Sequence, residues 1–194
     1  MQMKDKGELF WKLLEPEYLQ GMMFCRKLMG DRDGGDDLYQ DALVNALTGF
    51  ERLRNPKAFK PWFYRVMINT FRGTIRRPWW KRRVAMTAKI ELQLVGDNPI
   101  AAHTARRWLK RAFEAVSPEE QALTVLHELE EWNIKELAEL YGSTEGSIKA
   151  RLFRARRKMK KALLKFSRKP VAQKAAPEMI RKGSRCDAVK PSVE

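Results

Sequence analysis

The clearest alternation of apolar and polar positions lies in residues 133–166, toward the C-terminal end of the chain. Apolar residues in segment 134–141 recur at helical spacing, and Gly142 directly after it suits the left-handed turn that ends many helices. A second and longer run begins at Glu145. Its apolar residues fall on one face of a helix, namely Ile148, Leu152, Ala155, Met159 and Leu163. Two helices joined by a tight glycine-containing turn predict a helix-turn-helix.

Both helices of this motif are preceded by residues that cap a helix. Asn133 stands before the first with Glu136 three positions on, the spacing of a capping box, and Thr144 stands before the second. The outward positions of the second helix are mostly basic: Ser147, Lys149, Arg151, Arg154, Arg156, Arg157 and Lys158. In a DNA-binding helix-turn-helix this helix enters the major groove, where arginine matches the acceptors of a guanine edge. An ordinary helix pair with a solvated basic face, or a basic helix at a membrane surface, fits the same pattern.

Helical spacing recurs along most of the chain ahead of this motif. A first helical region covers residues 8–29 with a break at Pro16, and the DRDGG cluster predicts a loop over residues 30–35. Further helices are predicted to begin at Asp36 or Asp37, at Lys60-Pro61, at about Pro99 and at Ser117-Pro118, the last one closing at Trp132. Weak periodicity marks residues 81–98, with a short helix around 90–95, and the pattern decays after Ser167. The chain is therefore predicted to be all-α.

The helix that starts at Asp36 or Asp37 combines a buried face with an acidic one. Its predicted buried positions are Leu38, Tyr39, Ala42, Leu43, Ala46, Leu47 and Phe50. The opposite face carries Asp37, Gln40, Asp41, Val44, Asn45 and Thr48. Acidic residues in a first turn stabilise a helix through its dipole, which explains Asp36 and Asp37 better than Asp41. A docking face for another protein and a solvated face both fit this acidic patch around an exposed valine.

A segment rich in aromatic and basic residues follows, from Trp62 to Arg83. Rings interleaved with arginine and lysine suit single-stranded DNA, whose bases stack on them at about 1–3 kcal/mol each. The plainer interpretation assigns the first apolar residues to the core, and we favour it for most of them: Trp62, Phe63, Val66 and Met67. Polar or helix-breaking residues interrupt the buried face further on, and these remain candidates for DNA contact: Asn69, Arg72, Arg76, Arg77 and Trp79.

Composition narrows the choice among these interpretations. The 194 residues carry a net charge of +15, which favours a polyanionic partner, nucleic acid before membrane. The two cysteines, Cys25 and Cys186, lie far apart and suit a reducing compartment. No apolar run is long enough to span a bilayer, and the start of the chain lacks the apolar block of a signal peptide. We therefore expect a cytoplasmic protein without membrane insertion.

Enzyme chemistry finds little support in the sequence. The two histidines, His103 and His127, lie in no HExxH or triad-like setting, and no P-loop or glycine-rich phosphate cradle occurs. We expect no catalytic residues, no metal site and no cofactor.

Three blocks of the sequence resemble conserved regions of bacterial sigma factors. DDLYQDALVNAL, residues 36–47, is similar to the EDLVQE-type helix of the second region, and FKPWFYRVMINTFRGTIRR, residues 59–77, to the segment after it. SPEEQALTVLHELEEWNIKELAELYGSTEGSIKARLFRARRKMKKAL, residues 117–163, is similar to the fourth region, which often ends in GTVKSRLHRARKKL. The blocks occur in the family's order and cover most of residues 1–166. They match best the small two-domain group called extracytoplasmic-function sigma factors.

The resemblance implies two small helical domains joined by a flexible linker. Region 2 would span residues 1–80, the linker 81–105, region 4 residues 106–166, and a basic, disordered tail 167–194. The implied partners are core RNA polymerase, promoter DNA and an anti-sigma factor that covers the same surfaces. Core polymerase would be met at the clamp of its largest subunit and the flap of its second-largest subunit.

The same resemblance assigns site residues to three contacts. The polymerase interface would use Asp36, Asp37, Gln40, Asp41 and Val44. The minus-ten element would be recognised and melted by Arg65, Asn69, Thr70, Arg72, Arg76 and Arg77. The minus-thirty-five element would be read by the recognition helix through Thr144, Ser147, Lys149, Ala150, Arg151 and Arg154.

The chain departs from the family pattern inside the minus-ten segment. Pro61, Gly73 and Thr74 stand where the family usually has Thr, Asp and Arg, and a glycine within a helix costs about 1 kcal/mol relative to alanine.

A free-standing helix-turn-helix regulator is the second hypothesis. It would bind an operator without polymerase, usually as a dimer on paired half-sites. The acidic helix favours the sigma factor, because such a regulator has no use for it.

Overall fold

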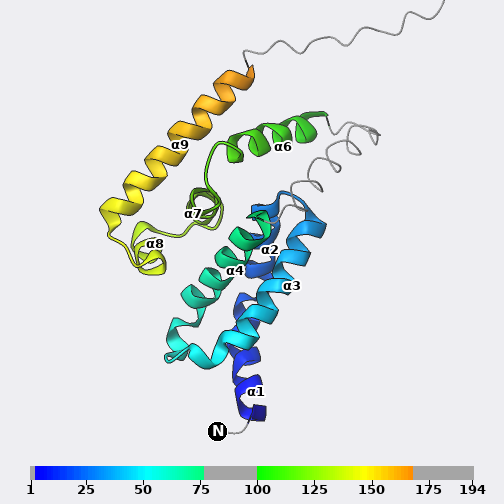
Figure 1. Ribbon diagram of the computed structural model, residues 1–194, viewed down its shortest axis with the longest axis vertical. Helices are drawn as coiled ribbons and strands as arrows, with labels where there is room; N and C mark the ends of the chain where they lie inside the picture. Colours follow the sequence, from blue (N-terminus) through cyan, green and yellow to red (C-terminus); the bar gives the residue numbers. More distant parts are fainter. Residues whose placement is uncertain (1–2, 77–99, 168–194) are drawn as a thin grey trace, which may run out of the picture.

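The computed structural model describes residues 3–76 and 100–167 (Figure 1). The N-terminal helices are α1 (Met3–Leu14), α2 (Tyr18–Met29), α3 (Arg32–Gly49) and α4 (Phe59–Arg76). The C-terminal helices are α6 (Ile100–Phe113), α7 (Pro118–Leu129), α8 (Ile134–Tyr141) and α9 (Glu145–Ser167). Short 3-10 turns cover Glu15–Glu17, Phe50–Arg52 and Pro56–Ala58. The described residues contain no strand, and the all-α prediction is confirmed.

The start of α3 differs from the sequence-based expectation of a loop over residues 30–35. Gly30 does end α2, with φ at +79°. Asp31 then caps the next helix, because its Oδ1 accepts a hydrogen bond from the backbone N–H of Gly34 at 2.6 Å. The helix therefore begins at Arg32, about one turn earlier than predicted, and the loop prediction is wrong.

Gly35, in the first turn of α3, allows a close approach to α2. Gly34 and Gly35 are both buried. A Cβ atom on Gly35 would lie 2.4 Å from the Cα atom of Arg26. Two non-bonded carbon atoms cannot come this close unless one of the two helices shifts. The residues that resemble a loop signal are therefore the contact between two helices.

Aromatic side chains form the core of the N-terminal helices. Phe59 and Phe63 of α4 stack with 5.6 Å between ring centroids, and Phe10 of α1 meets Phe59 edge-on at 5.8 Å. The α4 residues interpreted as core are buried or half-buried, which confirms that interpretation: Trp62, Phe63, Val66 and Met67.

The helix-turn-helix forms as predicted. Asn133 and Glu136 make a capping box at the start of α8, and Gly142 ends the helix with φ at +57°. Thr144 caps α9, because its Oγ1 accepts a hydrogen bond from the backbone N–H of Ser147 at 3.2 Å. On the predicted inner face of α9, Ile148, Leu152 and Ala155 are buried, whereas Met159 and Leu163 are half-buried.

The helix before this motif is shorter than predicted. Ser117 opens α7 with a second capping box, in agreement with the sequence. The helix ends at Leu129, three residues before Trp132, because the backbone N–H of Glu130 bonds to the carbonyl of Val125 and closes the last turn. Trp132 lies in the connection to α8, where its side chain is only 8% exposed.

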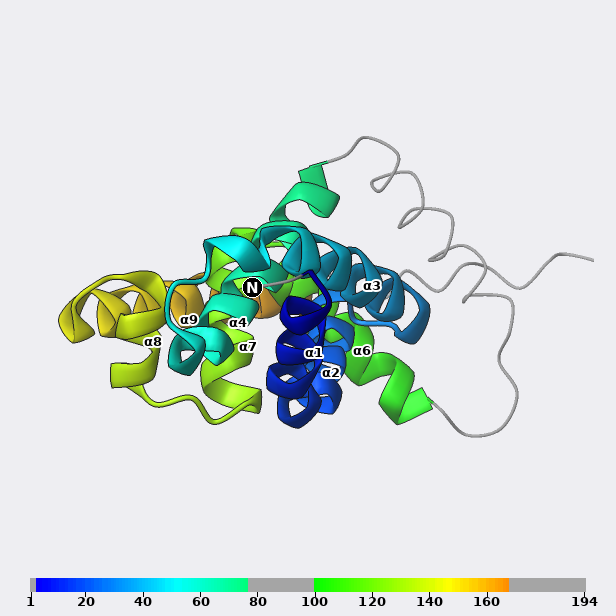
Figure 2. The same ribbon diagram turned by 90° about the horizontal axis from the view of Figure 1, so that it is seen from below.

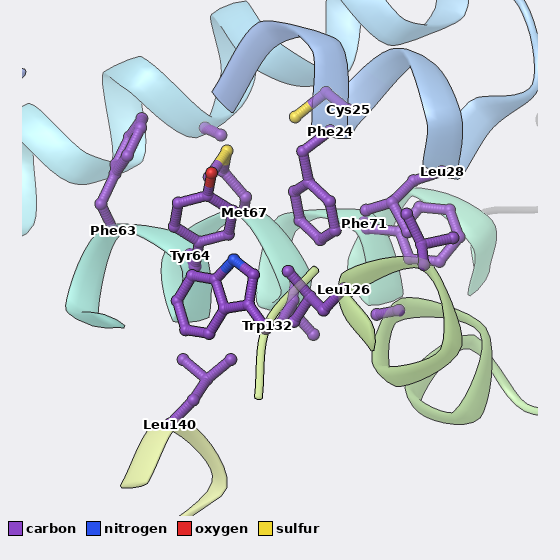
Figure 3. Packing of buried hydrophobic residues seen from close by; sticks show 14 of the residues in the cluster. Phe24, Cys25, Leu28, Phe63, Tyr64, Met67, Phe71, Leu126, Trp132 and Leu140 are labelled. Atoms are coloured by element: carbon purple, nitrogen blue, oxygen red, sulfur yellow. The ribbon is translucent and has the colours of Figure 1, made fainter. Parts of the chain in front are cut away.

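The N-terminal and C-terminal helices share one hydrophobic cluster. Helix α7 packs against α2 and α4, and α8 also contacts α4 (Figures 1 and 2). Trp132 stands 4.8 Å from Tyr64 between ring centroids. Figure 3 shows Leu126 and Leu140 on the same side of α4 as this tryptophan.

Several predictions concern residues 77–99 and 168–194, which lie outside the described residues. They include the linker, the short helix around residues 90–95, the tail, and the candidates Arg77 and Trp79. Among the helices that the structure describes, none combines the length and apolar character needed to cross a bilayer.

Candidate nucleic-acid and protein interfaces

The outward face of α3 carries four of the five residues assigned to protein docking. Asp37, Gln40 and Asp41 are exposed, and Val44 is 66% exposed. Leu47 was predicted to be buried, yet it is 50% exposed on the same side of the helix. The prediction fails because the fully buried stripe of α3 is narrow: Leu38, Tyr39, Ala42 and Ala46. We call Asp37, Gln40, Asp41, Val44 and Leu47 the acidic face.

Asp36, the fifth docking candidate, is engaged within the protein. Its carboxylate accepts hydrogen bonds from Nε and Nη2 of Arg26 at 2.6 and 3.0 Å, which ties α3 to α2. Arg32 lies 3.8 Å from the same carboxylate. The hydrogen bond from Arg26 lowers the pKa of Asp36 below its usual value. Asp36 therefore holds the helix that presents the acidic face.

The N-terminal half of α9 presents most of the residues assigned to the minus-thirty-five element. Lys149, Ala150 and Arg154 are exposed on one side of the helix, and Thr144 is exposed at its cap. Ser147 and Arg151 are half-buried instead. Burial raises the pKa of the Tyr141 hydroxyl in α8, and the nearby charge of Arg151 offsets part of that rise. Arg151 therefore lies beside α8 rather than on the outermost side of α9.

Sequence reasoning missed one residue on that exposed side. Phe153 is 63% exposed, although phenylalanine normally belongs to the core. It lies three and four positions after Ala150 and Lys149, so the three side chains share one helix face. Arg157, also exposed, continues this face by another turn. Counting helical spacing away from the buried stripe would have found Phe153, whose ring can contact the methyl group of thymine.

The basic residues on another side of α9 are paired with acidic residues of α7. Nε of Arg156 donates to Oε1 of Glu128 at 2.9 Å, and Nζ of Lys158 lies 2.6 Å from Oε1 of Glu120. These ion pairs hold α9 against α7. The basic surface of α9 is therefore divided between residues that face solvent and residues that support the motif.

Two arginines assigned to the minus-ten element have partners in the C-terminal helices. Nη1 of Arg72 lies 3.2 Å from Oε1 of Glu119 in α7. Arg65 donates a hydrogen bond to the backbone carbonyl of Leu140 in α8.

The other minus-ten candidates lie elsewhere on α4. Asn69 and Arg76 are exposed. Thr70 is half-buried, and its hydroxyl donates to the carbonyl of Val66 at 2.9 Å while it accepts from Nδ2 of Asn45 at 3.1 Å. Thr70 thereby connects α4 to α3 beside the exposed Asn69.

An apolar groove with a volume of about 480 Å³ lies between α6, α7 and α9. Its apolar lining consists mainly of Trp108, Met159, Leu163 and Leu164. Phe166 meets Trp108 edge-on, with 4.9 Å between ring centroids, at the C-terminal end of α9. The groove lies on the opposite end of α9 from Lys149 and Arg154, so the helix separates a basic surface from an apolar one.

Two family models match the chain in the order expected from the sequence. The model described as "Sigma-70 region 2" matches residues 22–81. The model described as "Sigma-70, region 4" matches residues 106–159. The first match includes the acidic face and α4, and the second includes the helix-turn-helix.

Curated relatives are similar over most of their length. RNA polymerase sigma factor SigV from Bacillus subtilis (strain 168) is 28% identical over 135 residues, 70% of this chain and 79% of the relative. ECF RNA polymerase sigma factor SigM from Mycobacterium tuberculosis (strain ATCC 25618 / H37Rv) is 28% identical over 155 residues, 79% and 76% of the two chains. RNA polymerase sigma-E factor from Streptomyces coelicolor is 26% identical over 142 residues, 72% and 77% of the two chains.

A solved structure shares the fold. The sigma factor RpoE from Bartonella quintana, solved in complex with the anti-sigma factor NepR, has a TM-score of 0.52 at 20% identity. The similarity covers 82% of this chain and 98% of that chain. With both sigma-70 regions matched in order and relatives similar along most of their length, the chain belongs to the sigma-70 family of RNA polymerase sigma factors, within its extracytoplasmic-function group.

Proposed function

We propose that this sigma factor docks on core RNA polymerase through the acidic face of α3 and the apolar groove beside α9, and binds promoter DNA through α4 and α9. The main observation that supports docking is the composition of the acidic face. Val44 and Leu47 are exposed apolar residues next to exposed Asp37 and Asp41. Apolar centres with charged surroundings are typical of protein interfaces. We assign this face to the coiled-coil clamp of the largest polymerase subunit.

We assign the apolar groove to the flap of the second-largest subunit. Trp108, Leu163 and Leu164 give it an apolar floor, while Arg156 and Lys160 stand among its lining residues. An apolar groove of this kind suits the apolar face of a helix from a partner. The two docking surfaces would then lie on separate domains, one on region 2 and the other on region 4.

In this proposal, exposed residues of α4 and α9 contact promoter DNA. On α4, Asn69 and Arg76 are exposed, and Asn69 is our candidate for holding an unstacked base of the minus-ten element. On α9, the exposed side would enter the major groove of the minus-thirty-five element and includes Lys149, Ala150, Phe153, Arg154 and Arg157.

Arg154→Ala should weaken holoenzyme binding to the minus-thirty-five element about 5- to 150-fold, which corresponds to about 1–3 kcal/mol for a bidentate guanine contact. The measurement is fluorescence anisotropy on promoter DNA with the native or a scrambled upstream element. Lys12→Ala is the control, because it removes one positive charge from an exposed position on α1 that belongs to none of the surfaces assigned to DNA or polymerase. An equal loss on both DNAs would make Arg154 a phosphate contact instead.

An anti-sigma factor is the third proposed partner. The Bartonella sigma factor was solved together with such a protein. The fold that the two chains share supports an equivalent partner here. The exposed acidic face and the apolar groove are the surfaces through which it would exclude polymerase.

Run-off transcription with purified bacterial core polymerase tests the proposal, using a pool of upstream genomic fragments as template. New discrete start sites that depend on this protein are expected, and they would also give the promoter motif. Absence of core binding and of transcription, together with tight sequence-specific DNA binding by the protein alone, would identify a free-standing regulator.

A further inference from the structure

A hydrogen bond joins the helix assigned to polymerase docking to the helix assigned to the minus-ten element. Helices α3 and α4 pack side by side (Figures 1 and 2). Across their contact, Nδ2 of Asn45 in α3 lies 3.1 Å from Oγ1 of Thr70 in α4. Asn45 directly follows Val44 of the acidic face. Thr70 directly follows Asn69, our candidate for holding an unstacked base. Asn45 itself belongs to none of the surfaces assigned to polymerase or DNA.

The hydrogen bonds of Thr70 fix the direction of this contact. A hydroxyl group has one hydrogen to donate and two lone pairs that accept. The hydroxyl of Thr70 donates its hydrogen to the backbone carbonyl of Val66, one helical turn earlier, at 2.9 Å. Thr70 can therefore only accept from Asn45, so the amide of Asn45 turns its nitrogen toward Thr70 and its oxygen away.

These contacts leave the Thr70 hydroxyl with a single free lone pair. A phosphate oxygen is an acceptor and cannot bond to that lone pair, and the side chain of Thr70 is half-buried. The backbone carbonyl of Thr70 accepts a further hydrogen bond from the hydroxyl of Thr74 at 3.0 Å, and Thr74 is only 7% exposed. The geometry therefore favours a supporting role for Thr70 over direct contact with the DNA backbone.

Asn69 depends on this support. Its side chain is exposed, and within the described part of the chain it makes no hydrogen bond to another residue. A side chain that holds an unstacked base must be placed to within about 0.5 Å, which requires support from neighbouring residues. For Asn69 such support comes from Thr70, the next residue, which Asn45 ties to α3.

We propose that Asn45 is a positioning residue for promoter melting, because its amide holds Thr70 and thereby places Asn69 at a fixed position relative to α3. The helix that docks on polymerase then also sets the place at which the unstacked base is captured. This inference rests on the proposed function, since it takes Asn69 to hold that base. The hydrogen bond between Asn45 and Thr70 does not depend on it.

Holoenzyme binding to a single strand tests the proposal. The strand carries the non-template minus-ten sequence of a promoter mapped by run-off transcription, and fluorescence anisotropy measures its affinity. A series of strands, each with one abasic site, identifies the captured base as the position at which Asn69→Ala no longer weakens binding. The variants are Asn45→Ala, which removes the donor, Thr70→Val, which removes the hydroxyl at similar shape, and both together. Thr48→Ala is the control, because its exposed hydroxyl donates to the carbonyl of Val44 within the same helix.

Asn45→Ala should weaken binding of the intact strand about 3- to 10-fold, the range expected from the loss of one hydrogen bond. Thr70→Val should have a similar effect, and the double variant should lose no more than either single variant, because all three break the same contact. On the strand that lacks the captured base, these variants and the wild type should bind equally. The affinity of Asn45→Ala for core polymerase, and the strand affinity of Thr48→Ala, should stay within about twofold of wild type.

Several outcomes would overturn the proposal. Wild-type affinity of Asn45→Ala for the strand would show that Asn45 positions nothing. Additive losses in the double variant would mean that Asn45 acts on DNA by itself, and an equal loss on the abasic strand would mean that the base is not involved. Weaker binding of Asn45→Ala to core polymerase would place Asn45 in the docking surface instead. Wild-type strand binding by Asn69→Ala would contradict the proposed function of Asn69 and remove this inference with it.

Discussion

Asp37→Lys together with Asp41→Lys should reduce the affinity for core RNA polymerase about 100-fold or more. Like charges brought together at an interface cost several kcal/mol, and about 1.4 kcal/mol corresponds to each factor of ten. Both residues are exposed on α3, so the helix itself should tolerate the change. Affinity is measured by anisotropy of labelled sigma factor titrated with core polymerase, and circular dichroism checks the fold.

The matched control is Glu8→Lys together with Glu15→Lys. Both glutamates are exposed, on α1 and the turn after it, and the double variant changes the net charge by the same amount. Core affinity close to wild type in this control is expected. If the α3 variant also kept wild-type affinity, the acidic face would have no part in docking.

Gly35→Ala should destabilise the protein by about 1–3 kcal/mol or more, measured by urea denaturation. The added Cβ atom would lie 2.4 Å from Cα and 2.8 Å from the backbone N of Arg26, and backbone atoms cannot rotate away as a side chain can. Helix α3 must therefore shift away from α2. That shift also strains the bidentate contact between Arg26 and Asp36 and displaces the acidic face.

Gly73→Ala, at another glycine within a helix, should stabilise the protein, in contrast to Gly35→Ala. Apart from the adjacent backbone of its own helix, a Cβ atom on Gly73 would meet no atom within 4 Å, and the residue is exposed within α4. Alanine loses less backbone freedom on folding, so the variant should gain about 0.5–1 kcal/mol of stability. Equal effects of the two substitutions would mean that packing at Gly35 is not as tight as the structure indicates.

Local signals allowed much of this fold to be predicted from the sequence. The capping boxes at Ser117 and Asn133 and the left-handed Gly142 each depend on a few adjacent residues, and the structure forms all three. The buried stripe of α9 follows from helical spacing alone. The exposure of Val44 could be predicted in the same way, because helical spacing places this apolar residue on the polar side of its helix.

Features that depend on distant residues could not be predicted in this way. Gly35 resembled a loop residue because its role is to make room for Arg26 of another helix. Trp132 was placed at the end of a helix, although its position is set by Tyr64, far away in the chain. The partners of Arg65 and Arg72 likewise lie in the other domain. The resemblance to sigma factors assigned both arginines to the minus-ten element but gave no information about what covers them.

The shared hydrophobic cluster has a consequence for how the free protein melts. Phe24 and Met67 of region 2 belong to the same buried cluster as Leu126 and Leu137 of region 4. Two domains with separate cores would melt in two steps, whereas one continuous core couples them into a single cooperative unit. Calorimetry of the free protein should therefore show one heat-absorption peak, and a substitution in the core of either domain should lower the melting temperature of both.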